Sequence, residues 1–180
     1  MIGKSTGNRY IIEVSTLTDK GVINHDSNET GNQIIGTRTF EASIQNVFNA
    51  YTMKEKFEQW FFPKGGSLKV YEFNPKPGGK NFFKIQMPDA ESYTVQQYDE
   101  IEAPHKIIYH DYFADEKGNI NTDMNGMRVE LYLTSKGSST TEVKSVSVMP
   151  SEEAAKQLME MGVEQGMEST LDQLEELLKR

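Results

Sequence analysis

Residues 150–180 read PSEEAAKQLMEMGVEQGMESTLDQLEELLKR and predict one long amphipathic helix that closes the chain. At about 100° per residue, its Ala, Leu, Met and Val side chains fall on one stripe and its acidic side chains fall opposite. Pro150, the N-cap Ser151 and the acidic pair Glu152 and Glu153 mark its start. We therefore expect one face of this helix to be buried and the other to face water.

Two glycines, Gly162 and Gly166, lie in the middle of the apolar stripe. Each glycine in a helix interior costs roughly 1 kcal/mol relative to alanine. Because residues four apart lie on the same face of a helix, the pair removes side-chain volume from one place. Either a neighbouring backbone packs very close at that place, or a cavity lies beneath it.

The composition limits the class of protein. A chain of 180 residues has the size of one domain, and its net charge of −8 argues against nucleic acid or an anionic membrane as a partner. The absence of cysteine excludes disulfides, thiolate nucleophiles and cysteine metal sites, and it fits a reducing compartment, so we expect the cytoplasm. No apolar run approaches the roughly 20 residues of a membrane span, and residues 1–9 lack the apolar stretch of a signal peptide.

The rest of the chain reads as one domain preceded by an extension. Residues 1–32 are rich in polar residues, with a β-like run at 10–17 and a turn signal at 19–21, so they predict either an extra hairpin or a mobile extension. The domain, 33–180, opens with a strand at 33–41. A short helix capped by Ser43 and a second short helix at 54–60 follow.

Six further strands are predicted, because runs of alternating or β-prone residues lie between turn-rich segments. Their short connections predict an antiparallel meander, and only the final helix is long enough to cover one of its faces. The fold class is therefore α+β. The six strands are expected at residues 68–73, 81–87, 93–101, 106–113, 127–133 and 140–149.

This order of elements resembles the helix-grip fold of the START-like, or SRPBCC, superfamily. Motifs resemble the branch that includes homologues of the activator of the 90-kDa heat-shock chaperone ATPase. The resemblance spans about residues 34–178 and implies a curved antiparallel sheet wrapped around a long C-terminal helix, with a cavity between them. The motifs are RTFEA at 38–42, VFNAYT at 47–52, EQWFFPKG at 58–65, PGGK at 77–80, EIEAPHKIIY at 100–109 and GMESTLDQL at 166–174.

Three residues depart from that branch. Gln96 stands where many relatives carry glycine, Asp111 where an aromatic residue is common, and Met167 where many carry tryptophan. We expect these differences to change the shape and polarity of the cavity.

Strand alternation nominates the residues that line the cavity, although the opposite parity and a simply filled core both remain open. On the strand at 106–113, one face carries Tyr109 and Asp111. The predicted lining is Trp60, Phe73, Phe83, Ile85, Tyr98, Tyr109, Asp111, Val129 and Leu131, with Met159, Gly162, Val163, Gly166 and Met167 as the roof.

Asp111 is the strongest single candidate for a residue that contacts a polar group of a ligand. A carboxylate in apolar surroundings has a raised pKa unless a donor such as Tyr109 or Tyr98 satisfies it. Asp111 would then orient a polar group of a ligand. The alternative is an aspartate at a strand end that reaches solvent.

No motif for catalysis or metal binding is present. His25, His105 and His110 share no evident site, and the sequence has no H-E-x-x-H, no phosphate-binding loop and no G-x-S-x-G. We therefore predict no catalytic residue, metal or cofactor.

The leading hypothesis is a non-enzymatic protein that binds a small, largely apolar ligand between sheet and helix. The resemblance implies two alternatives: a co-chaperone-like module that regulates a heat-shock ATPase, and a cyclase- or hydrolase-type enzyme using the same cavity. An enzyme would depend on Asp111 and Tyr109. The resemblance also implies a monomer or weak homodimer.

Overall fold

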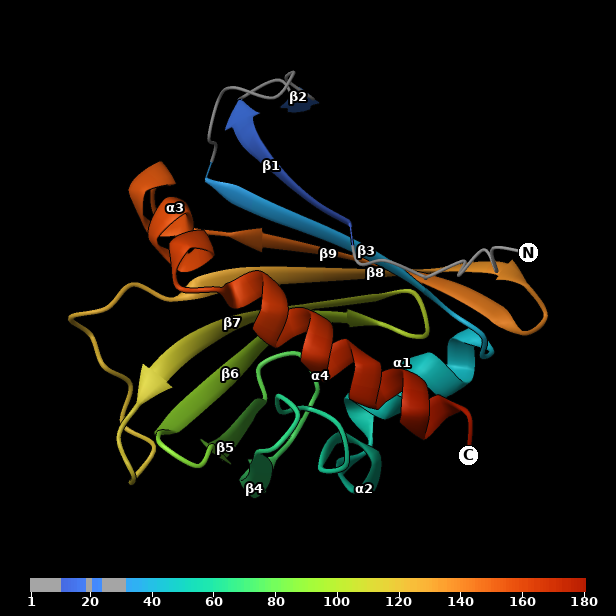
Figure 1. The fold of residues 1–180 in the computed structure, drawn as a ribbon, viewed down its shortest axis with the longest axis horizontal. Helices are drawn as coiled ribbons and strands as arrows, with labels where there is room; N and C mark the ends of the chain where they lie inside the picture. Colours follow the sequence, from blue (N-terminus) through green and yellow to red (C-terminus); the bar gives the residue numbers. More distant parts are fainter. Residues whose placement is uncertain (1–10, 19–20, 24–31) are drawn as a thin grey trace, which may run out of the picture.

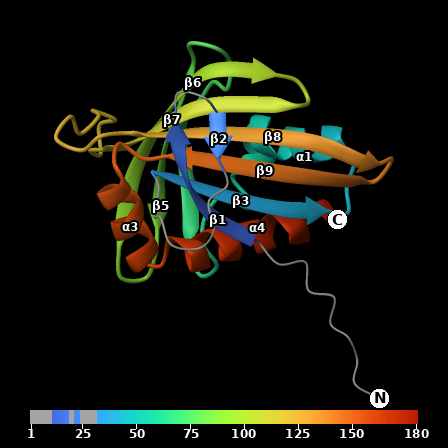
Figure 2. The ribbon, with the colours of Figure 1, turned by 90° about the horizontal axis from the view of Figure 1, so that it is seen from above.

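The computed structural model describes the backbone of residues 11–18, 21–23 and 32–180, and the side chains of residues 32–180. A curved antiparallel sheet forms one layer, and a long helix crosses one of its faces (Figure 1). Figure 2 shows the curvature of the sheet from above, with this helix on one side of it. The layers are those of an α+β helix-grip fold.

The sheet has nine described strands in the order β2-β1-β3-β9-β8-β7-β6-β5-β4, and every neighbouring pair is antiparallel. From β4 to β9 each strand pairs with the next along the chain, as expected for a meander. The bounds are β1 (Ile11–Thr18), β2 (Gly21–Ile23), β3 (Gln33–Phe40), β4 (Ser67–Phe73), β5 (Lys80–Gln86), β6 (Glu91–Glu102), β7 (Lys106–Ala114), β8 (Met127–Gly137) and β9 (Thr140–Val148).

Strands β1 and β2 belong to the N-terminal segment that precedes the domain. β1 pairs with β2 on one side and with β3 on the other, so this segment extends the sheet at the β3 edge. Most of the expected turn, at Asp19 and Lys20, lies outside the described residues, as do residues 1–10 and 24–31.

Two short helices follow β3, as predicted. The hydroxyl of Ser43 accepts a hydrogen bond from the Asn46 backbone N–H at 3.3 Å and caps α1 (Ile44–Thr52). The second helix, α2 (Lys54–Phe57), is shorter than the expected 54–60. Residues 58–62 turn away instead, and the indole Nε1 of Trp60 donates to the Ala50 carbonyl at 3.0 Å, which holds this turn against α1.

The C-terminal segment is not one continuous helix, so that expectation was wrong. It forms α3 (Glu152–Glu160) and α4 (Val163–Leu178), which are separated by Met161 and Gly162. Gly162 has a φ of 82°, in the left-handed region that ends a helix and that favours glycine. Thus α4 alone is the long helix across the sheet, while α3 packs beside β3.

The largest core cluster lies where α1 and α4 meet the sheet. Leu174 on α4 and Val47 on α1 are fully buried, and they belong to the same cluster as Leu131 on β8 and Ile107 on β7. Each fully buried side chain of this size stabilises the fold by roughly 1.5–3 kcal/mol. This cluster fixes the C-terminal half of α4 to the sheet.

Candidate functional site

A cavity of about 310 Å³ lies between the sheet and α4. Side chains of β3, β7, β8 and β9 form its floor, α4 forms the roof, and the turn at residues 61–63 adds part of the wall. The lining is mostly apolar and includes the aromatic rings of Tyr51, Trp60, Phe61 and Tyr109. Its position is the one expected for a ligand site in this kind of fold.

The structure brings together most of the residues nominated from the sequence. Tyr109 and Asp111 point to the same side of β7 as the cavity, with Val129 beside Tyr109 on β8. The predicted residues that line the cavity are Trp60, Ile85, Tyr109, Asp111, Val129, Leu131, Val163, Gly166 and Met167.

Five nominated residues lie outside the cavity. Phe73 and Phe83 pack with Phe57, because the curved sheet carries this part of β4 and β5 under α2, while Ile85 of β5 still reaches the cavity. Tyr98 is buried in the main core, Met159 packs in a small cluster with Ile34, Met149 and Ala155, and Gly162 lies at the break between α3 and α4.

The two glycines of the final segment have different roles. At Gly166, a Cβ atom would meet nothing within 4 Å, so no backbone packs against it and it opens onto the cavity. At Gly162, the positive φ is the requirement. The sequence predicts one shared role for both glycines, either close backbone packing or a cavity. In the structure, Gly166 leaves space beside the cavity and Gly162 allows the turn between α3 and α4.

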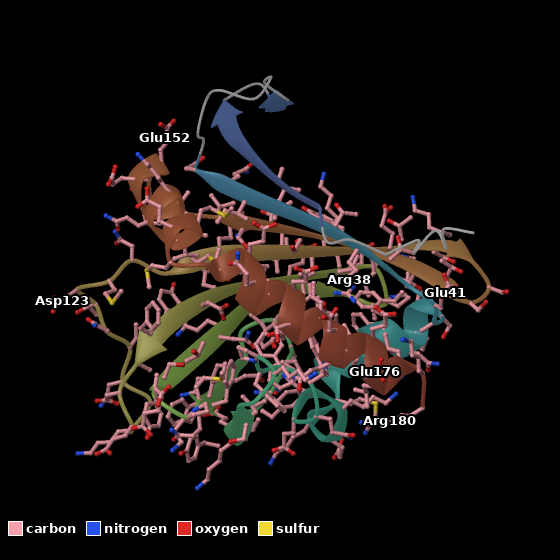
Figure 3. The ribbon with its side chains drawn as sticks, viewed as in Figure 1. Arg38, Glu41, Asp123, Glu152, Glu176 and Arg180 are labelled. Atoms are coloured by element: carbon pink, nitrogen blue, oxygen red, sulfur yellow. The ribbon has the colours of Figure 1, made fainter. Side chains whose placement is uncertain are left out.

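Arg38 is a lining residue that the sequence reasoning missed. Its side chain is only 4% exposed, and Figure 3 shows it between the sheet and α4. Burial opposes its charge, but hydrogen bonds to Glu175 and Asp172 outweigh this and raise its pKa. The sequence could have identified it, because Arg38 lies an even number of residues from Ile34 and Phe40 on β3. All three side chains therefore point to the same, buried face of the strand.

Asp111 lies at the other polar point of the cavity, opposite Gln96 on β6. Gln96 and Asn81 are buried, and their strands place Asn81, Gln96 and Asp111 in one row across β5, β6 and β7. Burial raises the pKa of Asp111 to about 7, although a hydrogen bond from the Gln96 side chain opposes the shift. Gln96 and Asp111 are therefore direct neighbours across β6 and β7.

A chain of hydrogen bonds supports this row. The Asn81 amide Nδ2 donates to Tyr98 Oη at 2.8 Å and to Gln96 Oε1 at 3.3 Å, and Tyr98 Oη donates to Gln96 Oε1 at 3.3 Å. Burial and the nearby Asp111 carboxylate raise the pKa of the Tyr98 phenol, so it stays protonated. Tyr98 thus supports Asp111 through Gln96.

Two buried side-chain polar atoms in residues 32–180 have no hydrogen-bond partner within the protein, and both belong to residues that line the cavity. They are Nε of Arg38 and Oδ1 of Asp111. A buried polar atom without a partner costs roughly 1–3 kcal/mol, so natural proteins rarely keep one without a reason.

The cavity contains Asp111 and Tyr109, the two side chains on which an enzyme would depend. No histidine lines the cavity, and Asp111 is its only carboxylate. Within the described part of the chain, no three His, Asp or Glu side chains gather as metal ligands would. Asp111 and Arg38 can hold polar groups of a ligand.

The curved sheet, the crossing helix and the cavity between them define a START-like domain. The chain belongs to the family described as activator of Hsp90 ATPase homolog 1-like protein, whose model matches residues 41–179. No curated protein matches this sequence.

Solved structures agree with this assignment. A Staphylococcus epidermidis protein is 49% identical over 84% of this chain and 92% of its own, with a TM-score of 0.76. A Mycobacterium smegmatis protein is 26% identical over 82% of this chain and 90% of its own, with a TM-score of 0.75. The AHSA1 protein of Silicibacter pomeroyi, at 15% identity and a TM-score of 0.66 over 82% of this chain and 97% of its own, shares the fold.

None of the helices in the described residues has the length and apolar character that a membrane span requires.

Proposed function

We propose that this chain is a non-enzymatic binding protein whose cavity takes one small, largely apolar ligand. The observation that carries the proposal is the coincidence of an apolar cavity with two unpartnered buried polar atoms, on Arg38 and Asp111. Apolar walls supply affinity through burial, and a few polar atoms supply orientation.

The size of the cavity limits the ligand. Ligand sites typically measure about 300–1,000 Å³, and the 310 Å³ observed here lies at the lower end of that range. The aromatic rings of Trp60, Phe61 and Tyr109 along its wall suit a flat or ring-containing molecule.

Trp60 is a built-in reporter of binding. It is the only tryptophan of the chain, it is 1% exposed and it lines the cavity. We therefore expect titration with para-propyltoluene, an apolar probe, to change Trp60 fluorescence in a saturable way. At 100 times its dissociation constant, the probe should also add about 2.7 kcal/mol to the free energy of unfolding.

Gly166 provides the matched variants. A leucine at this position would extend into the cavity, whereas an alanine adds one methyl group where nothing lies within 4 Å. Gly166→Leu should abolish the fluorescence change while Gly166→Ala keeps most of it. Equal binding by wild type and Gly166→Leu would refute the cavity as the binding site.

Family membership favours a second candidate, a co-chaperone-like module that stimulates a heat-shock chaperone ATPase. The test is the steady-state ATPase rate of the 90-kDa chaperone from the same organism, with and without this chain. Stimulation that persists in Gly166→Leu would show that this activity does not use the cavity. No binding and no stimulation would remove the candidate.

A further inference from the structure

We infer that the cavity selects an apolar ligand carrying a hydroxyl group, which donates a hydrogen bond to Asp111 Oδ1, and that Gln96 is the residue that positions Asp111 to accept it. The inference rests on the proposed function, since it names the chemistry of the ligand for the same cavity. It adds a specificity-determining residue and a positioning residue to a site otherwise defined by apolar walls.

Asp111 Oδ1 is a buried acceptor without a donor among residues 32–180. Asp111 as a residue retains some exposed surface, but its Oδ1 has almost none and has no donor within the protein. A buried acceptor gains most from a donor that enters with the ligand, because water does not satisfy it as it does at the surface. Oδ1 therefore favours a ligand with an O–H or N–H group over a pure hydrocarbon.

Gln96 orients the Asp111 carboxylate. Asp111 lies directly opposite Gln96, and the Gln96 side chain hydrogen-bonds the carboxylate. Gln96 Oε1 accepts from both Asn81 Nδ2 and Tyr98 Oη, each at 3.3 Å, which directs its amide nitrogen away from them and fixes its orientation. The hydrogen bond from Gln96 thus fixes the Asp111 carboxylate, while Oδ1 has no partner within the described part of the protein.

The charges that line the cavity favour a neutral donor over an ammonium group. Arg38 already places one positive charge on the cavity, and its two carboxylate partners, Asp172 and Glu175, lie on α4. A ligand ammonium would bring a second cation into apolar surroundings with Asp111 as the only carboxylate in the lining. A hydroxyl group satisfies Oδ1 without that desolvation cost.

The experiment compares two ligands of nearly the same shape, para-propylphenol and para-propyltoluene, which differ by a hydroxyl in place of a methyl group. At pH 8, where Asp111 with its pKa of about 7 is mostly ionised, Trp60 fluorescence gives both dissociation constants for wild type, Asp111→Leu, Gln96→Met and Tyr132→Phe. Tyr132 is the control because it does not line the cavity and its hydroxyl donates to Glu130 at the surface. The measured quantity is the preference for the phenol, and its change between variants cancels the difference in hydration of the two probes.

We expect the preference to fall at least about tenfold in Asp111→Leu, as for loss of a hydrogen bond to a charged or buried acceptor. It should fall by a smaller factor in Gln96→Met and stay unchanged in Tyr132→Phe. In carbon-labelled wild type, the phenol and not the toluene should move the carboxyl carbon resonance of Asp111, a result that requires no variant to fold.

The outcomes separate the two proposals. If both probes bind but the preference is unchanged in Asp111→Leu, or the Asp111 resonance responds equally to both, the hydroxyl inference is overturned and the binding function stands. If neither probe binds the folded wild type, the binding function fails and the inference fails with it.

Discussion

Arg38 on β3 and Glu175 on α4, 137 residues apart in the chain, are joined by a hydrogen bond of 2.5 Å from Nη2 to Oε2. The same Nη2 lies 2.6 Å from Oδ1 of Asp172, one turn earlier on α4. The guanidinium is buried beneath the helix, so this contact connects the floor of the cavity to its roof. The ion pair thus joins β3 to α4 and adds to the apolar contacts that hold α4 on the sheet.

The two acidic partners of Arg38 should differ in importance. Glu175 is 29% exposed and Asp172 is 62% exposed, so solvent screens the second more strongly. We expect Glu175→Gln to lower the free energy of unfolding by about 1–3 kcal/mol and Asp172→Asn by less than about 1 kcal/mol, measured by urea denaturation. A larger loss of unfolding free energy in Asp172→Asn than in Glu175→Gln would show that the more exposed ion pair is the more stabilising one.

The two glycines of the C-terminal segment provide an internally controlled test. Gly162→Ala forces a Cβ atom into a left-handed backbone and should destabilise the fold by about 1–2 kcal/mol. Gly166→Ala lies inside α4, where the added methyl group meets nothing, and should stabilise the fold by up to about 1 kcal/mol. Thermal and urea unfolding of both variants measure whether each substitution raises or lowers the free energy of unfolding. Stabilisation by both would mean that α3 and α4 can join as one helix.

Asp111 should make stability depend on pH. Its pKa rises from 3.8, the ordinary value, to about 7 in the folded chain, chiefly because it is buried. Between these values the folded chain binds more protons than the unfolded chain, so this group lowers the free energy of unfolding as pH rises from about 4 to about 7. Asp111→Asn removes the effect. We expect the free energy of unfolding of Asp111→Asn, relative to that of wild type, to increase by up to about 4 kcal/mol between about pH 4 and pH 7 and then to level off.

The measurement is urea unfolding of wild type and Asp111→Asn at a series of pH values. Taking the difference between the two proteins cancels the titration of the other carboxyl groups. A difference that stays constant from about pH 4 to 8 would contradict the raised pKa of Asp111.

The hydrogen bonds behind Asp111 should be stabilising. Tyr98→Phe removes the oxygen that accepts from Asn81 and donates to Gln96, which leaves buried polar groups short of a partner. We expect a loss of about 1–2 kcal/mol. Tyr132→Phe is the control, because Tyr132 is 37% exposed and its hydroxyl donates to Glu130 at the surface, so its change should stay within about 0.5 kcal/mol. Equal losses in Tyr98→Phe and Tyr132→Phe would mean that the buried hydrogen bonds of Tyr98 stabilise the fold no more than a surface hydrogen bond does.

Much of the fold could be predicted because its signals are local. Alternation with a period of two marks a strand whatever lies beside it, and the Ser43 and Ser151 caps mark helix starts through bonds to backbone three residues away. The same alternation correctly placed Tyr109 and Asp111 on one face of β7. It equally placed Phe83 inward, but the curvature of the sheet carries Phe83 under α2.

By itself, the sequence determined the order of the strands and the two short helices, the α+β class and which side of each strand is apolar, since these depend on neighbours along the chain. Only the tertiary structure decided that Gly162 is a break and Gly166 an opening, because both fit the same helical pattern until packing is known. It also decided the role of Arg38: an arginine is expected in water unless carboxylates meet it, and the two that do come from the far end of the chain. Contacts between distant segments create the cavity, and no local pattern records them.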